Sequence, residues 1–172
     1  MFREMRRKRQ ELPREEVLSI LERATSGVLA VEGDEGYPYA VPMSFLYEEG
    51  KLYFHSAAAG HKLDALQRNN RASFCVIDRD LVSPEEYTTY YRSVIVFGKI
   101  RFLKGAEARG AILRLSEKYA PGNRAGLEQE IRKSAGRLCM LELSIEHMTG
   151  KEAIELVRGR EAALDHNRLS SE

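Results

Sequence analysis

Short apolar runs separated by turn signals dominate the first hundred residues of the chain. Runs of this length, rich in β-branched and aromatic residues and bounded by Gly, Pro and Asn, are typical of β-strands. Strands are therefore expected at 28–31, 37–47, 52–55, 72–77, 90–102 and 138–145. The continuous apolar run at 28–31 predicts a buried strand. Gly98, inside a long strand, predicts a β-bulge.

Apolar residues at helical spacing are confined to fewer segments. After Pro13, the spacing of Val17, Leu18, Leu21 and Ala24 predicts a helix that packs one face on the sheet. Further helices are expected at 63–68, 108–119, 127–133 and 152–157. Many strands with short turns and few crossover helices favour an antiparallel barrel over a doubly wound sheet. The predicted fold class is therefore mainly β with flanking helices.

Two prolines mark the segment 37–47 as an unusual strand. Pro38 and Pro42 have no N–H to donate to a central ladder, so this strand is expected to be irregular or at an edge. Its unpaired backbone would be free to meet a ligand. The turn at 48–51 leads into 52–55, which predicts three strands in antiparallel succession.

Composition indicates one folded domain without a global electrostatic bias. The chain has 172 residues, of which 43% are hydrophobic, and 27 Lys and Arg balance 26 Asp and Glu. A net charge of +1 gives no field to hold nucleic acid or an anionic membrane, so any anion site must be local. We expect a single domain over 1–172, with a basic, solvated N-terminal arm at 1–12 and a polar C-terminal tail at 159–172.

The cysteine pattern and the absence of long apolar runs favour a cytoplasmic protein. Cys75 and Cys139 lie far apart, without CxxC spacing, and are expected to be buried free thiols in a reducing compartment. No apolar run approaches the roughly 20 residues that span a bilayer, and the N-terminus lacks the apolar region of a signal peptide. No histidine pair has metal-ligand spacing, so a metal site is not expected.

The segment 54–66 is the most informative for chemistry. A strand ends, a loop of small residues at 56–60 follows, and His61 and Lys62 begin a helix. The free N–H groups and the dipole of a helix N-terminus favour negative charge, Lys62 adds a positive charge, and His61 can donate a hydrogen bond. This combination suits a phosphate, although an ordinary solvated helix start has the same composition.

The order of these features resembles a known family. The chain is similar to the pyridoxamine 5'-phosphate oxidase-like FMN-binding split barrels, and within them to the Nim-type nitroimidazole-resistance proteins. The resemblance extends from Arg6 to about Glu155. The segments that carry it are 27–30, 36–42, 53–55, 60–62, 88–98 and 149–152.

The resemblance implies a homodimer that holds FMN between its subunits, with FAD as a possible larger cofactor. The phosphate would be held by His61 and Lys62, and the flavin ring would lie along the proline-bearing strand. The implied cofactor-binding residues are Tyr39, Ala40, Val41, Pro42, Met43, Ser44, His55, Ser56, His61, Lys62, Arg92 and Ser93.

Departures from the family pattern narrow the expected activity. His61 stands where the oxidase tends to have Arg, and Ser93 replaces a Gln. The C-terminal segment with Trp and Arg, by which the oxidases hold their substrate, is not found, so oxidation of vitamin B6 is not expected. The leading hypothesis is a flavin-dependent reductase that takes electrons from a nicotinamide or similar donor and reduces a small planar acceptor such as a nitroaromatic. His61 is the preferred catalytic residue.

Two alternatives remain open from the sequence. One is a flavin-binding module without turnover, for storage, sensing or delivery, because nothing in the sequence specifies a nicotinamide site. The other is haem binding, with His55, His61 or His147 as ligand, since some relatives on this barrel bind haem. For His147, which follows the last expected strand, a structural role has the greater weight.

Overall fold

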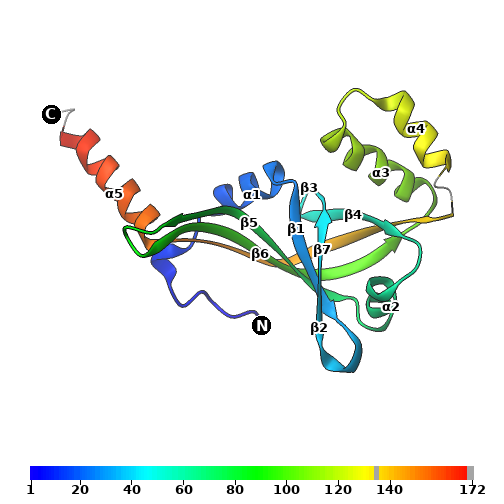
Figure 1. Ribbon diagram of the computed structural model, residues 1–172, viewed down its shortest axis with the longest axis horizontal. Coiled ribbons are helices and arrows are strands. Elements are labelled where there is room, and N and C mark those ends of the chain that lie inside the picture. Colours follow the sequence, from blue (N-terminus) through cyan, green and yellow to red (C-terminus); the bar gives the residue numbers. More distant parts are fainter. Residues whose placement is uncertain (134–135, 170–172) are drawn as a thin grey trace.

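A single antiparallel sheet organises the chain. The computed structural model describes residues 1–133 and 136–169. Within them, the sheet has the strand order β2-β1-β5-β6-β7-β4-β3 (Figure 1). The strands are β1 (Ser26–Glu32), β2 (Pro38–Ser44), β3 (Leu46–Glu48), β4 (Lys51–Ala57), β5 (Arg71–Ser83), β6 (Thr88–Leu103) and β7 (Leu138–Glu152).

Helices flank this sheet, which confirms the predicted mainly β class. Figure 1 shows α3 and α4 together at one end of the molecule and α5 projecting from the other end. The α-helices are α1 (Arg14–Arg23), α2 (His61–Arg68), α3 (Gly105–Tyr119), α4 (Arg124–Lys133) and α5 (Ile154–Leu169). Short 3-10 turns occur at Lys8–Gln10 and Asp34–Gly36.

The sheet curves around one core and carries a second core on its other side. In the larger core, Phe74 makes edge contacts with Phe45 and Phe54 at centroid distances of 4.9 and 5.1 Å. Val17, Ile20 and Leu21 of α1 bury the apolar face that the helical spacing predicted. The smaller core lies under α3 and consists of Tyr53, Leu103, Ala111, Ile112, Leu115 and Met140.

The segment 37–47 forms two strands, because the chain turns away at Phe45. β2 pairs with β1 at one edge of the sheet, whereas β3 pairs with β4 at the opposite edge. The predicted antiparallel pairing of 37–47 with both neighbouring strands is confirmed, but the segment is two strands and not one. The crossing at Phe45 is what brings the two edges of the barrel together. The edge position predicted for the strand with Pro38 and Pro42 is confirmed.

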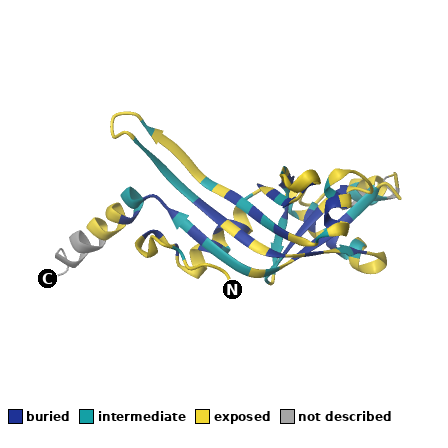
Figure 2. Ribbon diagram, turned by 90° about the horizontal axis from the view of Figure 1, so that it is seen from below, coloured by how far each residue is buried: buried dark blue, intermediate teal, exposed yellow. Residues whose placement is uncertain are grey.

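Alternation of buried and exposed residues corrects the prediction for 28–31. Leu29 and Val31 are buried, but Val28 is 37% exposed, so this strand is buried on one side only. The same alternation runs along β6 (Figure 2). A β-bulge separates Phe97 from Gly98, as predicted. A methyl group on Gly98 would lie 2.2 Å from the Ser144 carbonyl oxygen, so only glycine fits there.

Both terminal segments contain more structure than the sequence indicated. Leu12 is buried, its N–H donates to the Gly150 carbonyl, and the buried Gln10 side chain donates to the Glu152 carbonyl at 3.0 Å. The last part of the expected N-terminal arm is thus attached to β7. At the other end, α5 continues to Leu169, so residues 159–169 of the expected tail are helical.

Candidate functional site

The N-terminus of α2 offers backbone donors that no side chain caps. Gly60 precedes the helix with a φ of +123°, a conformation that favours glycine. The Gly60 carbonyl accepts from the N–H groups of Leu63 and Asp64. The first residues of a helix have no intrahelical acceptor, so the amides of His61 and Lys62 remain available for an anion.

Lys62 is a half-buried cation beside these donors. Its Nζ lies 3.9 Å from the Met43 sulfur on β2. In the described part of the chain, no carboxylate lies within ion-pair distance of this ammonium group. Burial lowers the pKa of Lys62, because a desolvated ammonium group is costly without a counter-charge. An anion bound here would supply that charge, so the residues fit a phosphate group. We call this place the Lys62 site.

His61 turns away from Lys62. Its ring stacks on Tyr39 at a centroid distance of 4.1 Å, and its Nε2 lies 3.4 Å from an Asp34 carboxylate oxygen. Arg68 donates to the other oxygen of Asp34 at 2.6 Å. The two basic side chains that the sequence suggested as a pair therefore diverge. Lys62 faces Met43, and His61 faces the turn between β1 and β2.

A second place, the roofed pocket, brings Ser44 and His55 together. It is a cavity of about 380 Å³ between the β2 and β4 strand ends and the helices α3 and α4. Its lining residues are Ser44, His55, Ile112, Leu115, Ser116, Tyr119, Leu127, Glu130, Ile131 and Leu138. Ser44 directly follows Met43, so the chain connects this pocket to the Lys62 site. The sequence did not predict the contribution of α3 and α4.

The C-terminal end of α3 is clamped above this pocket. The Lys118 ammonium donates to the carbonyls of Ala24 and Phe45 at 2.6 and 3.1 Å. The Tyr119 hydroxyl accepts from the Phe45 N–H at 2.8 Å and donates to the Thr25 carbonyl. Burial lowers the pKa of Lys118. These bonds fix the roof to the point where the chain crosses from β2 to β3.

The remaining β2 and β4 residues of the predicted site divide between two faces. Ala40 and Pro42 are on the outer side of β2, and Pro42 pairs with the exposed Val28. Val41 packs against the larger core. Ser56 is buried and lies opposite Cys139 in the β4–β7 ladder.

Arg92 and Ser93 lie on β6, three strands away from β2 in the same chain. The ladder connects Ala40 through Ala30 to Ser73 and Phe97, and Arg92 is five residues, or about 17 Å, further along β6. The Ser93 hydroxyl is hydrogen-bonded to Tyr91 at 2.9 Å. The structure does not bring this pair to the other predicted flavin residues of the same chain.

Arg92 instead belongs to a cluster of charged side chains near the N-terminal end of α1. Its guanidinium group lies 3.4 Å from Glu152, 3.6 Å from Glu16 and 3.9 Å from Asp78. Glu152 is fully buried and also pairs with Arg160 of α5. This cluster attaches the C-terminal helix to the sheet.

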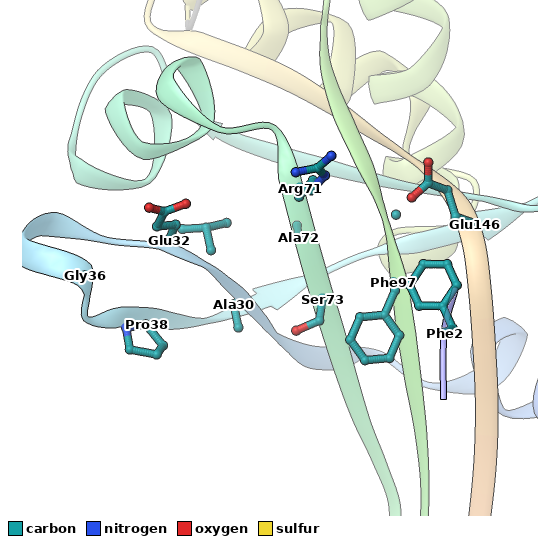
Figure 3. A pocket seen from close by; sticks show the side chains of 12 residues that line it. Phe2, Ala30, Glu32, Gly36, Pro38, Arg71, Ala72, Ser73, Phe97 and Glu146 are labelled. Atoms are coloured by element: carbon teal, nitrogen blue, oxygen red, sulfur yellow. The ribbon is translucent and has the colours of Figure 1, made fainter. Parts of the chain in front are cut away.

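The outer face of the sheet is apolar and open. Val28, Ile77, Ile95 and Phe97 are between 37% and 62% exposed there. The N-terminal segment crosses part of this face, where the Phe2 ring stacks on His147 at 4.8 Å and contacts Phe97. Figure 3 shows Phe2 and Phe97 side by side in a cleft of about 470 Å³ that continues to Ala30 and Pro38.

Within the described residues, no helix is both long and apolar enough to cross a membrane. The same residues contain no group of three or more His, Cys, Asp or Glu side chains placed to hold a metal ion.

Comparisons with solved structures agree with this architecture. A proposed 5-nitroimidazole antibiotic resistance protein from Bacteroides thetaiotaomicron is 25% identical, with a TM-score of 0.70 over 83% of this chain and 86% of that one. An FAD and heme binding protein from Mycobacterium smegmatis is 25% identical, with a TM-score of 0.72 over 84% and 73%. An FAD-binding protein from Mesorhizobium loti is 23% identical, with a TM-score of 0.60 over 83% and 95%.

The sequence itself places the chain in a family. No curated protein matches it. The model of the pyridoxamine 5'-phosphate oxidase family, however, matches residues 13–152, which include the whole sheet. Together with the split-barrel sheet and the nitroimidazole-resistance neighbour, this match confirms the resemblance. The chain belongs to the pyridoxamine 5'-phosphate oxidase family.

Proposed function

We propose that this protein binds FMN at the Lys62 site and uses it to reduce small planar acceptors such as nitroaromatics. The observation that carries the proposal is Lys62, a half-buried ammonium group without a carboxylate partner in the described chain, next to free helix N–H groups. A phosphate supplies the missing charge and accepts from those donors. The flavin ring then has the exposed side of β2, at Ala40 and Pro42, as its support.

Flavin binding by relatives supports the same cofactor class. The proteins from M. smegmatis and M. loti described above bind FAD. FMN ends in a terminal phosphate, whose three free oxygens can accept from both the Lys62 ammonium group and the α2 N–H groups, whereas the diphosphate of FAD lies between the flavin and an adenosine. FAD is therefore the alternative cofactor, and mass analysis of the released chromophore distinguishes the two.

A homodimer with shared flavin sites is the second part of the proposal. Four large apolar side chains on the outer face remain exposed in a single chain, which is typical of an interface. Arg92 and Ser93 lie on β6, three strands away from β2 in their own chain, and we assign them to the flavin of a second copy. Their role as flavin ligands is part of this proposal.

When bound, the flavin supplies hydride and electron transfer, and the chain supplies position and shelter from water. Lys62 and the α2 amides hold one end of the cofactor. The roofed pocket would hold an acceptor in a partly enclosed, largely apolar space. His55 is the histidine that lines this pocket, and its imidazole can donate a proton to an acceptor oxygen. His61, which stacks on Tyr39, is retained as the sequence-based candidate for the same task.

Anaerobic reduction of the purified protein tests the activity. We expect a yellow protein that NAD(P)H bleaches and that a nitroimidazole reoxidises. His55→Ala should slow reoxidation more than His61→Ala if the pocket histidine donates the proton. A flavin that NAD(P)H and other two-electron donors leave oxidised would contradict the reductase and favour a storage or sensing module.

Haem binding has less support from the geometry. An axial ligand needs an imidazole nitrogen that is free to reach iron, but His61 is engaged by Tyr39 and Asp34. His147 is covered by Phe2. Among the three candidates, His55 alone has no ring or carboxylate contact in the described chain, and we assign it to the acceptor pocket. A Soret band on titration with haem would reverse this preference.

A further inference from the structure

We infer that the roofed pocket is the acceptor site and that it selects uncharged, flat aromatic molecules over anionic ones. This inference rests on the proposed reductase function and specifies its substrate class. The cavity of about 380 Å³ lies within the range of roughly 300 to 1,000 Å³ that is usual for small-molecule sites.

The lining of the pocket is suited to an apolar ring. Its apolar lining residues come from α3 (Ile112 and Leu115), α4 (Leu127 and Ile131) and the start of β7 (Leu138). Such side chains offer dispersion contacts and no compensation for a desolvated charge. A flat ring can enter between the two helices and the strand ends without losing hydrogen bonds to water.

The charge at the pocket opposes an anion. Glu130 is the one carboxylate among the described lining residues, and no Lys or Arg is among them. The Lys62 ammonium group does not line this pocket. It lies beside Met43, where we propose that it binds the phosphate of the cofactor. The two places therefore differ in electrostatic preference: the Lys62 site favours an anion, and the roofed pocket disfavours one.

Few polar groups remain to orient a ligand. The Tyr119 hydroxyl is occupied by the backbone of Phe45 and Thr25, so it shapes the pocket and does not bind the ligand. The hydroxyl of Ser44 has no side-chain partner in the described chain, and His55 is exposed into the same space. These two groups can hydrogen-bond the polar substituent of a ring, such as a nitro group.

Equilibrium dialysis with nitrobenzene and 4-nitrobenzoate tests the inference, because the two probes share a ring and differ in charge. The purified protein, with the cofactor it carries, should bind nitrobenzene at least about tenfold more tightly than 4-nitrobenzoate. Glu130→Gln should reduce the difference in affinity between the two probes, because it removes the carboxylate that repels 4-nitrobenzoate. Ser116→Phe fills the cavity and should weaken nitrobenzene binding by about tenfold, whereas the matched control Ser116→Ala should change it by less than about twofold.

Flavin content separates the possible outcomes. We expect both Ser116 variants to retain the flavin of the unmodified protein. Loss of flavin in Ser116→Phe alone would show that the cavity houses the cofactor ring, and would overturn the inference. Equal affinity for the two probes, or no binding of nitrobenzene, would overturn it as well. A protein that binds nitrobenzene but carries no flavin would contradict the proposed function and leave the pocket assignment intact.

Discussion

At the residue scale, two charged side chains that are shielded from water, Lys62 and Glu152, differ in whether the chain supplies a counter-charge. Lys62 has no counter-charge in the described chain, whereas Glu152 is fully buried between Arg92 and Arg160. A charge that is shielded from water without a partner destabilises the folded chain. Such a charge is expected where a bound ligand supplies the opposite charge. A paired buried charge is a structural element, and its loss leaves the partners uncompensated.

Replacement of Lys62 should weaken flavin binding without unfolding the protein. We expect Lys62→Met to reduce affinity by about 1.5 to 3 kcal/mol, the usual contribution of a charged hydrogen bond. Fluorescence titration of the apoprotein with FMN measures this change, and circular dichroism checks the fold. An unchanged affinity would show that the phosphate binds elsewhere.

The pH dependence of flavin affinity follows from the lowered pKa of Lys62. Phosphate binding requires the ammonium form, so affinity should fall as pH rises through this lowered value, before an exposed lysine would lose its proton. The stability of the flavin-free chain should change in the opposite direction, because its folded state binds fewer protons than its unfolded state. Lys62→Met, titrated in parallel, should lose both dependences. A wild-type affinity that follows the variant's pH profile would contradict this account.

Removal of Glu152 should destabilise the fold. Glu152→Ala leaves Arg92, whose side chain is 20% exposed, without its buried partner, and we expect the free energy of unfolding to decrease by about 3 to 5 kcal/mol. Glu161, which forms an exposed ion pair with Arg9, is the matched control, and Glu161→Ala should reduce the free energy of unfolding much less than Glu152→Ala does, because solvent screens an exposed pair. Urea denaturation compares the two variants. Equal losses would show that the Glu152 cluster is not structural.

At the element scale, local signals predicted the strands better than their partners. The two prolines of β2 correctly indicated an edge strand, and Gly98 correctly indicated a bulge. Periodicity did not reveal the break at Phe45, because 37–47 is apolar or aromatic at every position except Ser44. The two halves of that segment separate only because the Phe45 ring enters the core and Tyr119 binds its backbone.

Gly98 offers a test of the bulge. An alanine methyl group would approach the Ser144 carbonyl oxygen and Leu143, so Gly98→Ala should reduce the free energy of unfolding by about 1 to 3 kcal/mol. A methyl group on Gly159 in α5 would meet no described residue within 4 Å, and Gly159→Ala should be neutral or slightly stabilising. Thermal or urea unfolding measures both. A neutral Gly98→Ala would contradict the close packing of β6 on β7.

At the scale of the whole molecule, part of the site could be predicted and part could not. The loop before α2 and the basic residue Lys62 were visible as a local pattern. The spacing of Ile112, Leu115 and Tyr119 was visible too, but it does not say whether that face covers a core or a cavity. The divergence of His61 from Lys62 depends on Asp34 and Tyr39, which are distant in sequence and come near only in the folded chain.

The exposed apolar side chains of the outer face predict that the protein forms a dimer. We expect a dimer by analytical ultracentrifugation, and Ile95→Lys, which places a charge in the middle of the exposed apolar strand, should shift it toward monomer and release flavin. Tyr37→Lys, at the exposed turn between β1 and β2, is the control and should change neither property. A wild-type monomer that retains flavin would contradict the shared site.

The visible spectrum of the freshly purified protein, followed by mass analysis of the released chromophore, tests the central claim most directly. The account predicts an oxidised flavin spectrum with about one FMN per chain, and much less flavin in Lys62→Met purified in the same way. A colourless protein that takes up neither FMN nor FAD, or a Lys62→Met variant with full flavin content, would contradict it.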